Sequence, residues 1–243
     1  MKRKLIFLLT LMLLFPALSR AQDVSPMAYY TDAEGEAQES VNIEDGQAPL
    51  DVTFRANPSD IDDWMPSYEW HFRKLNADAG YQEFMVRYEE DTQYLFSESG
   101  TYNIVLKTTF VNGTDTISPD STNIVVTIAE SRLEFPNAFS PNGDGINDLY
   151  GAKGINDPNS TSHYKSIVEF HAYIFNRWGQ KLFEWTDVSK GWDGTYNGHP
   201  VKEGVYFVLV KAKGADGKEY NIRRDVNLLR GFKESTSSST TTE

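Results

Sequence analysis

The chain has 243 residues, a formal net charge of −12 and no cysteine. Nucleic-acid binding requires a basic surface, so the acidic balance argues against a nucleic-acid partner. Without cysteine the protein cannot use disulfides, and its stability must come from packed cores, for which about 220 mature residues are enough.

Residues 1–21 have the pattern of a secretory signal peptide. Residues 2–4 are basic, residues 5–15 are almost wholly apolar, and small residues precede a cleavage position after Ala21. The alternative is a membrane anchor, but spanning a bilayer needs about 20 apolar residues and this run has about 11. We therefore expect an exported protein that begins at Gln22 and has no transmembrane span.

Residues 41–130 have the two-residue periodicity of β-strands. Apolar and polar side chains alternate in "PLDVTFRA", and "SYEWHF" and "STNIVVTIAE" repeat the pattern. Turn residues recur about every ten positions, which is typical of a β-sandwich. Residues 22–40 are polar and acidic, and we expect them to form a leader strand plus a loop.

The order "APLDVTFRA", "YEWHF" and "YLFSESGTYNIVLKTT" resembles a PKD-type domain, an Ig-like module of exported proteins. The resemblance implies that Gly100 opens a late core strand and that the ring of Tyr102 points inward. The acidic turn that the family carries after its Trp is replaced here by "HFRKLNADAG". No function is therefore transferred from that turn.

Residues 131–232 predict a second all-β unit. "AYIFNRWGQKLFEW" reads as a hairpin around Asn176 to Gly179, and "GWDGTYNGHPV" reads as a turn in which Trp192 fills the core and Asp193 accepts backbone amides. Gly204 then begins the central strand "VYFVLVKAK".

The succession "FPNAFSPNGDGIND", "IFNRWG", "WDGTYNG" and "PVKEGVYF" closely resembles the gliding motility-associated C-terminal domain. That family is also described as a type B sorting domain of the type IX secretion system of Bacteroidetes. The resemblance implies a small Ig-like β-sandwich and a partner in the secretion machinery. Its signature residues in this chain are Pro141, Gly143, Gly145, Asn176, Trp178, Gly179, Trp192, Asp193, Gly194 and Gly204.

The loop "SPNGDGIND" leaves two interpretations open. In the first, Asp144 and Asp148 fold back onto loop amides, while Phe139 and Ile146 enter the core. In the second, Asn142, Asp144 and Asp148 are ligands of a weak calcium site. Three oxygen side chains are fewer than the six to eight ligands of Ca²⁺, so carbonyls and water would complete the shell. No other cofactor is expected.

The sequence favours a non-enzymatic envelope or surface protein, because it contains no recognisable nucleophile or phosphate-binding motif. In one interpretation the C-terminal unit is a sorting module and the Ig-like unit is a spacer or a binder. In the other, a structural or adhesive envelope protein keeps the fold without the sorting role; the polar tail at 233–243, expected to be disordered, and the small size of the passenger favour it. Candidate partners are the secretion machinery, other envelope proteins and surface glycans.

Overall fold

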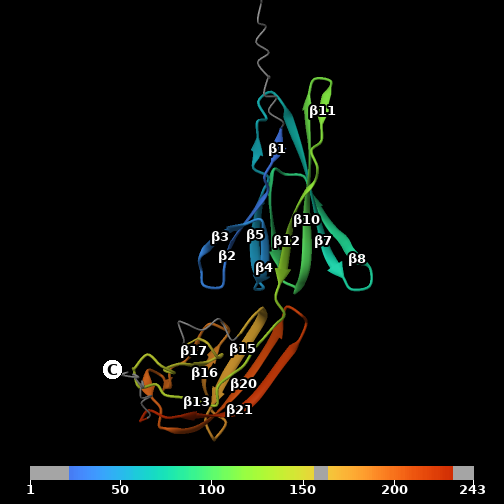
Figure 1. The fold of residues 1–243 in the computed structure, drawn as a ribbon. Helices are drawn as coiled ribbons and strands as arrows, with labels where there is room; N and C mark the ends of the chain where they lie inside the picture. Colours follow the sequence, from blue (N-terminus) through green and yellow to red (C-terminus); the bar gives the residue numbers. More distant parts are fainter. Residues whose placement is uncertain (1–21, 156–163, 232–243) are drawn as a thin grey trace, which may run out of the picture.

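The computed structural model of the chain describes residues 22–155 and 164–231. The expected signal peptide and the polar tail lie outside these residues. The described residues form strands, turns and loops without any helix, and two sandwich-like β bodies follow one another along the chain (Figure 1). The all-β prediction of two tandem sandwiches is therefore confirmed. In the described part of the chain, no helical segment of the length and apolar character needed to span a bilayer exists.

The N-terminal body has a six-stranded and a four-stranded sheet. The first has the order β4-β12-β10-β7-β8, with β11 paired to β10, and the second has the order β3-β2-β5-β9. Its strands are β1 (Asp23–Val24), β2 (Met27–Thr31), β3 (Ala37–Ser40), β4 (Asn42–Gly46), β5 (Leu50–Arg55), β6 (Pro58–Ser59), β7 (Met65–Asn76), β8 (Gly80–Arg87), β9 (Asp91–Phe96), β10 (Gly100–Asn112), β11 (Asp115–Ile117) and β12 (Thr122–Ile128).

Residues 22–40 form more structure than a leader strand plus a loop. Strand β2 pairs antiparallel with both β3 and β5, so this segment supplies two of the four strands of the second sheet. Only one side chain of β2 and β3, Ala28, is fully buried, so the segment lacks the strong alternation that reveals a strand in a sequence.

The C-terminal body has one five-stranded sheet of order β13-β21-β20-β15-β16. Two short ladders, β14–β17 and β18–β19, complete it. Its strands are β13 (Ala138–Phe139), β14 (Tyr150–Gly151), β15 (Ile167–Phe175), β16 (Lys181–Trp185), β17 (Gly191–Trp192), β18 (Thr195–Tyr196), β19 (His199–Pro200), β20 (Gly204–Gly214) and β21 (Glu219–Leu228). The strand that begins at Gly204 is the third of five, which confirms its predicted central place.

Each body has a hydrophobic core of its own. Alternation along β5 and β7 buries Phe54, Trp70 and Phe72 in the first core, where the rings of Phe54 and Phe72 meet edge to face. In the second core Trp192 packs against Tyr206 at a centroid distance of 5.1 Å. Tyr102 is buried in the first core, as the PKD resemblance implied.

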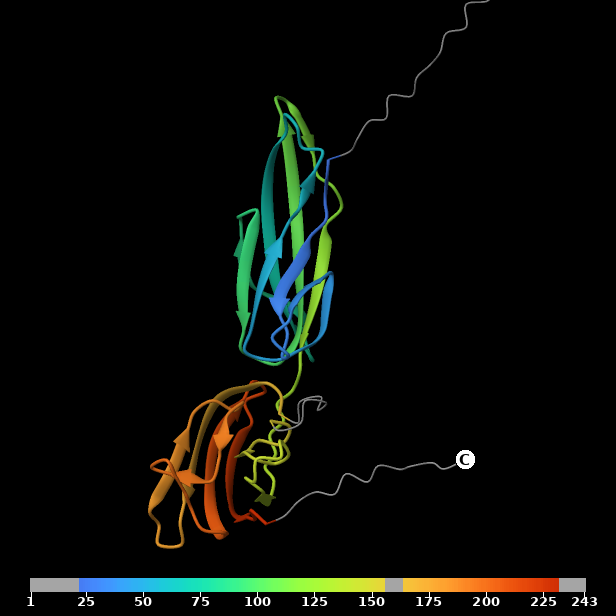
Figure 2. The ribbon, with the colours of Figure 1, turned by 90° about the vertical axis from the view of Figure 1, so that its left-hand side faces the viewer.

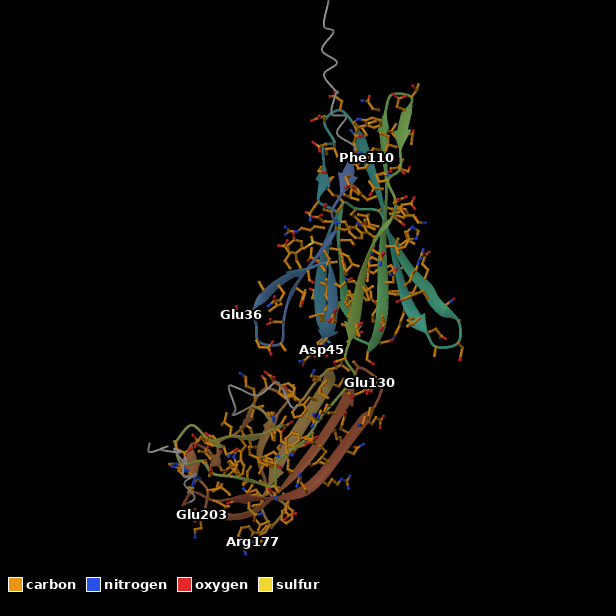
Figure 3. The ribbon with its side chains drawn as sticks, in the orientation of Figure 1. Glu36, Asp45, Phe110, Glu130, Arg177 and Glu203 are labelled. Atoms are coloured by element: carbon orange, nitrogen blue, oxygen red, sulfur yellow. The ribbon has the colours of Figure 1, made fainter. Side chains whose placement is uncertain are left out.

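The two bodies meet at the β20–β21 turn and at residues 165–166 (Figures 1 and 2). Ala215 packs into the core of the N-terminal body, and its carbonyl oxygen accepts the backbone N–H of Ser99 at 3.0 Å. Lys165 forms an ion pair with Asp45, which Figure 3 shows at the end of the N-terminal body that faces its neighbour. The junction is therefore built from polar contacts and from the apolar side chains of Ala215 and Val168, which pack against the N-terminal core.

Candidate functional site

The loop at residues 140–148 is organised around the carboxylate of Asp148. Its Oδ1 accepts the backbone N–H groups of Asn142 at 2.9 Å and Gly143 at 2.7 Å, and its Oδ2 accepts the N–H of Gly145 at 2.8 Å. The hydrogen bond from Gly143, followed by those from Gly145 and Asn142, lowers the pKa of Asp148 below its ordinary value of 3.8. Three amides bonded to one ionised group fix the path of the loop.

Asp144 and Asn142 form a second, smaller set of contacts. Asp144 Oδ1 accepts the N–H of Ile146 at 2.9 Å, and its Oδ2 accepts the side-chain amide of Asn142 at 2.9 Å. Asn142 Oδ1 accepts the N–H of Asp144 at 2.9 Å. These are Asx turns, in which a side chain replaces a backbone acceptor.

The expectation for the apolar residues of the loop is half right. Phe139 is buried and lies 5.4 Å from Trp192 between ring centroids, as expected. Ile146 is 37 % exposed, so its predicted place in the core is wrong. It stands between Gly145 and Asn147, which both have positive φ (85° and 53°), and this reversal of the backbone keeps its side chain at the surface.

Whether the loop holds calcium stays a prediction. Within residues 22–155 and 164–231, no group of three or more His, Cys, Asp or Glu side chains has the geometry of a metal site. Each of the candidate ligands Asn142, Asp144 and Asp148 already accepts at least one backbone N–H. Calcium would compete with those bonds for the same oxygen atoms.

The "WDG" turn adopts the geometry that its sequence suggested. Trp192 is fully buried, and its indole N–H donates to the carbonyl of Thr195 at 2.7 Å. Asp193 Oδ1 accepts the N–H and the hydroxyl of Thr195 at 2.9 and 2.7 Å. Gly194 has a φ of 76°, and a Cβ there would lie 3.0 Å from Pro141 and 3.1 Å from Leu228, so both the backbone and the space favour glycine.

Arg230 joins these separated motifs, and the sequence reasoning did not single it out. Its guanidinium donates to the carbonyls of Pro141 at 3.3 Å, Gly194 at 2.8 Å and Val201 at 3.1 Å. The carboxylate of Glu203 accepts the backbone N–H of Arg230. The sequence shows only that Arg230 is a cation two residues after the last strand. It does not show the three carbonyl partners, because they come from distant parts of the chain.

The "NRWG" segment forms the tight turn of the β15–β16 hairpin. Asn176 Oδ1 accepts the N–H groups of Trp178 and Gln180, both at 3.0 Å, and Gly179 has a φ of 80°. Trp178 is 79 % exposed, and the guanidinium of Arg177 stacks 4.9 Å from its ring. Figure 3 places Arg177 at the far end of the body from the junction. Trp178 therefore supports no core, in contrast to Trp192.

The outer face of the five-stranded sheet carries an apolar patch next to this turn. Phe175 pairs with Phe207 and Tyr173 with Leu209 in the β15–β20 register, and Val205 lies on the same face. Val205 and Phe207 are exposed. Exposed apolar groups that cluster on one face mark candidate contact surfaces for another protein.

The remaining signature glycines shape the backbone. Positive φ values occur at Gly143 (81°), Gly145 (85°) and Gly204 (140°). The histidines His71 and His171 pair with the carboxylates of Glu83 and Glu184 respectively.

The fold and these turns define an all-β protein of two sandwich-like bodies. In the second body, Arg230 and polar turns hold the loops at one end together. Residues 133–223 match the family model described as the CHU_C Type IX secretion signal domain. The C-terminal part of the chain is therefore a type IX secretion signal domain, which confirms the resemblance found in the sequence. Such a domain indicates export to the cell surface or the extracellular space and an interaction with the secretion machinery. The match identifies a secretion signal domain and no catalytic family.

The chain is similar to several solved structures, among them the following three. The FN1–FN3 domains of chicken CNTN1 are 9 % identical over 79 % of this chain and 71 % of theirs, with a TM-score of 0.24. A Bacteroides ovatus protein, SGBP-B of a mixed-linkage glucan utilization locus in complex with a mixed-linkage heptasaccharide, is 14 % identical over 77 % of this chain and 42 % of its own, with a TM-score of 0.23. A tetra-tandem repeat from the extending region of a large adhesion protein is 11 % identical over 86 % and 68 %, with a TM-score of 0.25. At these TM-scores we draw nothing from the likenesses. Among curated proteins, no match to the chain is found.

Proposed function

We propose that this protein is a non-enzymatic surface protein whose C-terminal body, residues 131–232, is the sorting module and whose N-terminal body is the exported passenger. The family match at residues 133–223 carries the proposal. The separate hydrophobic core of that body supports the proposal, because a signal domain that follows a passenger must fold independently of the passenger.

The features gathered at one end of the C-terminal body suggest what the machinery reads. Arg230 ties the signature loop, the "WDG" turn and the end of β21 together, and the exposed Trp178 and the apolar patch around Phe207 belong to the same body. Tryptophan and arginine side chains are the ones that most often dominate protein–protein binding. In this proposal Arg230 holds the recognition surface in shape, and Trp178 and Phe207 contact the machinery.

A fusion experiment tests the proposal. Residues 131–243 are attached to a periplasmic reporter in cells with an intact type IX system and in cells that lack it. We expect the reporter at the surface or in the medium only in the intact cells, with loss of export for Trp178→Ala and Phe207→Ala. A matched change on the same sheet, Asn221→Ala, should leave export unchanged.

Equal surface exposure of the full-length protein in both cell types would overturn the sorting role. It would instead support a structural or adhesive envelope protein that keeps the fold without the signal.

A further inference from the structure

The N-terminal sandwich is open along one side. Strand β8 is the outermost strand of one sheet and β9 is the outermost strand of the other, so neither has a neighbour on this side. Figure 1 shows β8 at the outer edge of the body. A cleft of about 500 Å³ lies here, and its lining includes Phe84, Tyr94 and Tyr102.

Aromatic rings form the apolar wall of this cleft. The ring of Phe84 lies 5.5 Å from that of Tyr94 and 6.1 Å from that of Tyr102, measured between centroids. Phe84 is the extra residue of a β-bulge, because Met85 pairs with Phe72 and Glu83 pairs with Arg73. A bulge changes the direction in which a side chain points, and here it brings Phe84 onto the rings of the cleft.

The rings of Tyr102 and Phe96 are covered. Phe84 is instead 45 % exposed, at a place where polar side chains surround it. An apolar ring with convergent polar groups around it is the usual composition of a small-molecule site.

The polar side of the cleft has no net charge. The Nζ of Lys74 lies 2.7 Å from the carboxylate of Glu98 and 5.3 Å from the centroid of the Tyr102 ring. These two are the charged side chains of the lining, and they offset one another. Gln82 adds an exposed amide whose Nε2 donates to the carbonyl of Ala79 at 2.8 Å, which leaves its Oε1 to accept a hydrogen bond from a ligand.

This combination selects a ligand class by elimination. An anion or a cation would gain little here, because each charge of the lining is already paired with the other. A hydrocarbon would remove the ion pair and the amide from water without replacing their hydrogen bonds. A neutral pyranose has one face of C–H groups that can pack on an aromatic ring, and hydroxyls that can bond to an amide, an ammonium and a carboxylate. We propose that the cleft between β8 and β9 binds a neutral oligosaccharide through Phe84, Gln82 and the Lys74–Glu98 pair.

This site lies outside the sorting module, and the proposal does not depend on how the protein is exported. Calorimetric titration of the purified chain without residues 1–21 tests it directly. The probes are cellohexaose, laminarihexaose and mannohexaose, with hexagalacturonate as the anionic comparison. We expect saturable binding of at least one neutral hexasaccharide and weaker binding of hexagalacturonate.

Substitutions at Phe84 and Gln82 locate the binding in the cleft. Phe84→Ala should weaken the affinity by about tenfold or more, and Phe84→Tyr should restore most of it. Gln82→Ala removes an exposed amide whose protein partners are the carbonyls of Ala79 and Tyr81 in the adjacent turn, so it should lower the affinity while changing the melting temperature little. Tyr88→Ala is the matched control, because Tyr88 follows β8, is 69 % exposed and does not line the cleft.

Three outcomes would overturn the proposal. The first is the absence of binding of every neutral hexasaccharide at millimolar concentration. The second is tighter binding of hexagalacturonate than of the neutral probes. The third is unchanged affinity in both Phe84→Ala and Gln82→Ala, which would place any sugar binding elsewhere on the protein.

Discussion

The carboxylate of Asp148 accepts the backbone N–H of Gly143 at 2.7 Å, five residues earlier in the chain. Together with the amides of Asn142 and Gly145, this contact closes the loop into a ring of hydrogen bonds. The loop's shape therefore depends more on Asp148 than on Asp144, which accepts a single backbone amide.

Replacing Asp148 by Ala should destabilise the C-terminal body by about 1–2 kcal/mol, below the full value for a charged hydrogen bond network because the loop is partly exposed. Asp144→Ala should cost less, and Glu219→Ala, an exposed carboxylate on β21, should cost nothing measurable. Calorimetric melting of the three variants checks the order. An Asp144→Ala effect as large as that of Asp148→Ala would contradict it.

Calcium and a chelator should give nearly the same melting curve for the protein. The candidate oxygens already accept backbone amides, and a ligand stabilises the native state only to the extent that it binds there. Scanning calorimetry with millimolar calcium and with chelator makes the comparison. A rise of several degrees with calcium in the wild type, absent in Asp144→Asn, would establish a metal site instead.

The contribution of Asp148 to stability should depend on pH. Its folded pKa lies below the ordinary value of 3.8, so the native state binds its proton less readily than the unfolded state does. The stabilisation is therefore complete above about pH 4 and disappears as the pH falls through the folded pKa. The difference in unfolding free energy between the wild type and Asp148→Asn, measured from neutral to acid pH, should shrink below about pH 4. A difference that stays constant across that range would show that the charge is not responsible.

The two tryptophans of the signature should respond in opposite ways. Trp192→Ala removes a fully buried ring and should cost about 3–5 kcal/mol, whereas Trp178→Ala removes an exposed ring and should change stability by about 0.5 kcal/mol or less. Denaturant titration followed by circular dichroism measures both. A large loss of stability for Trp178→Ala would mean that it supports the fold and would weaken its proposed part in recognition.

Alanine substitutions at Gly194 and Gly217 should distinguish the stability cost of backbone strain from the cost of steric contact. Both glycines have positive φ, 76° and 80°, but a Cβ at Gly194 meets three side chains within 3.2 Å, while one at Gly217 meets nothing within 4 Å. Gly217→Ala should cost about 1 kcal/mol, from strain alone. Gly194→Ala should cost more, since it also displaces Arg230 from its carbonyl partners. Equal losses would show that the contacts around Gly194 relax freely.

The sequence by itself determined the all-β class, the tandem order of the two bodies and most of the turns. These depend on local chemistry. Alternating apolar residues mark strands such as β5 and β7, and the Asx turns at Asn176 and Asp193 are formed by side chains that bond to amides within a few residues. The family resemblance added the type IX secretion signal domain, because its motifs lie in order along the chain.

Only the tertiary structure decided which residues meet across long separations. The weak alternation of residues 22–40 predicted one leader strand and a loop, whereas in the structure β2 pairs with β5 and β3 pairs with β2. The partners of the Arg230 guanidinium are distant in the sequence, so no local pattern predicts its contacts. Arg230 joins the two turns because β21 ends beside Pro141 and Gly194. The cleft of Phe84 and Tyr94 likewise exists only where the edges of two sheets come together. Local patterns follow from backbone geometry over a few residues, whereas these contacts depend on how the sheets pack.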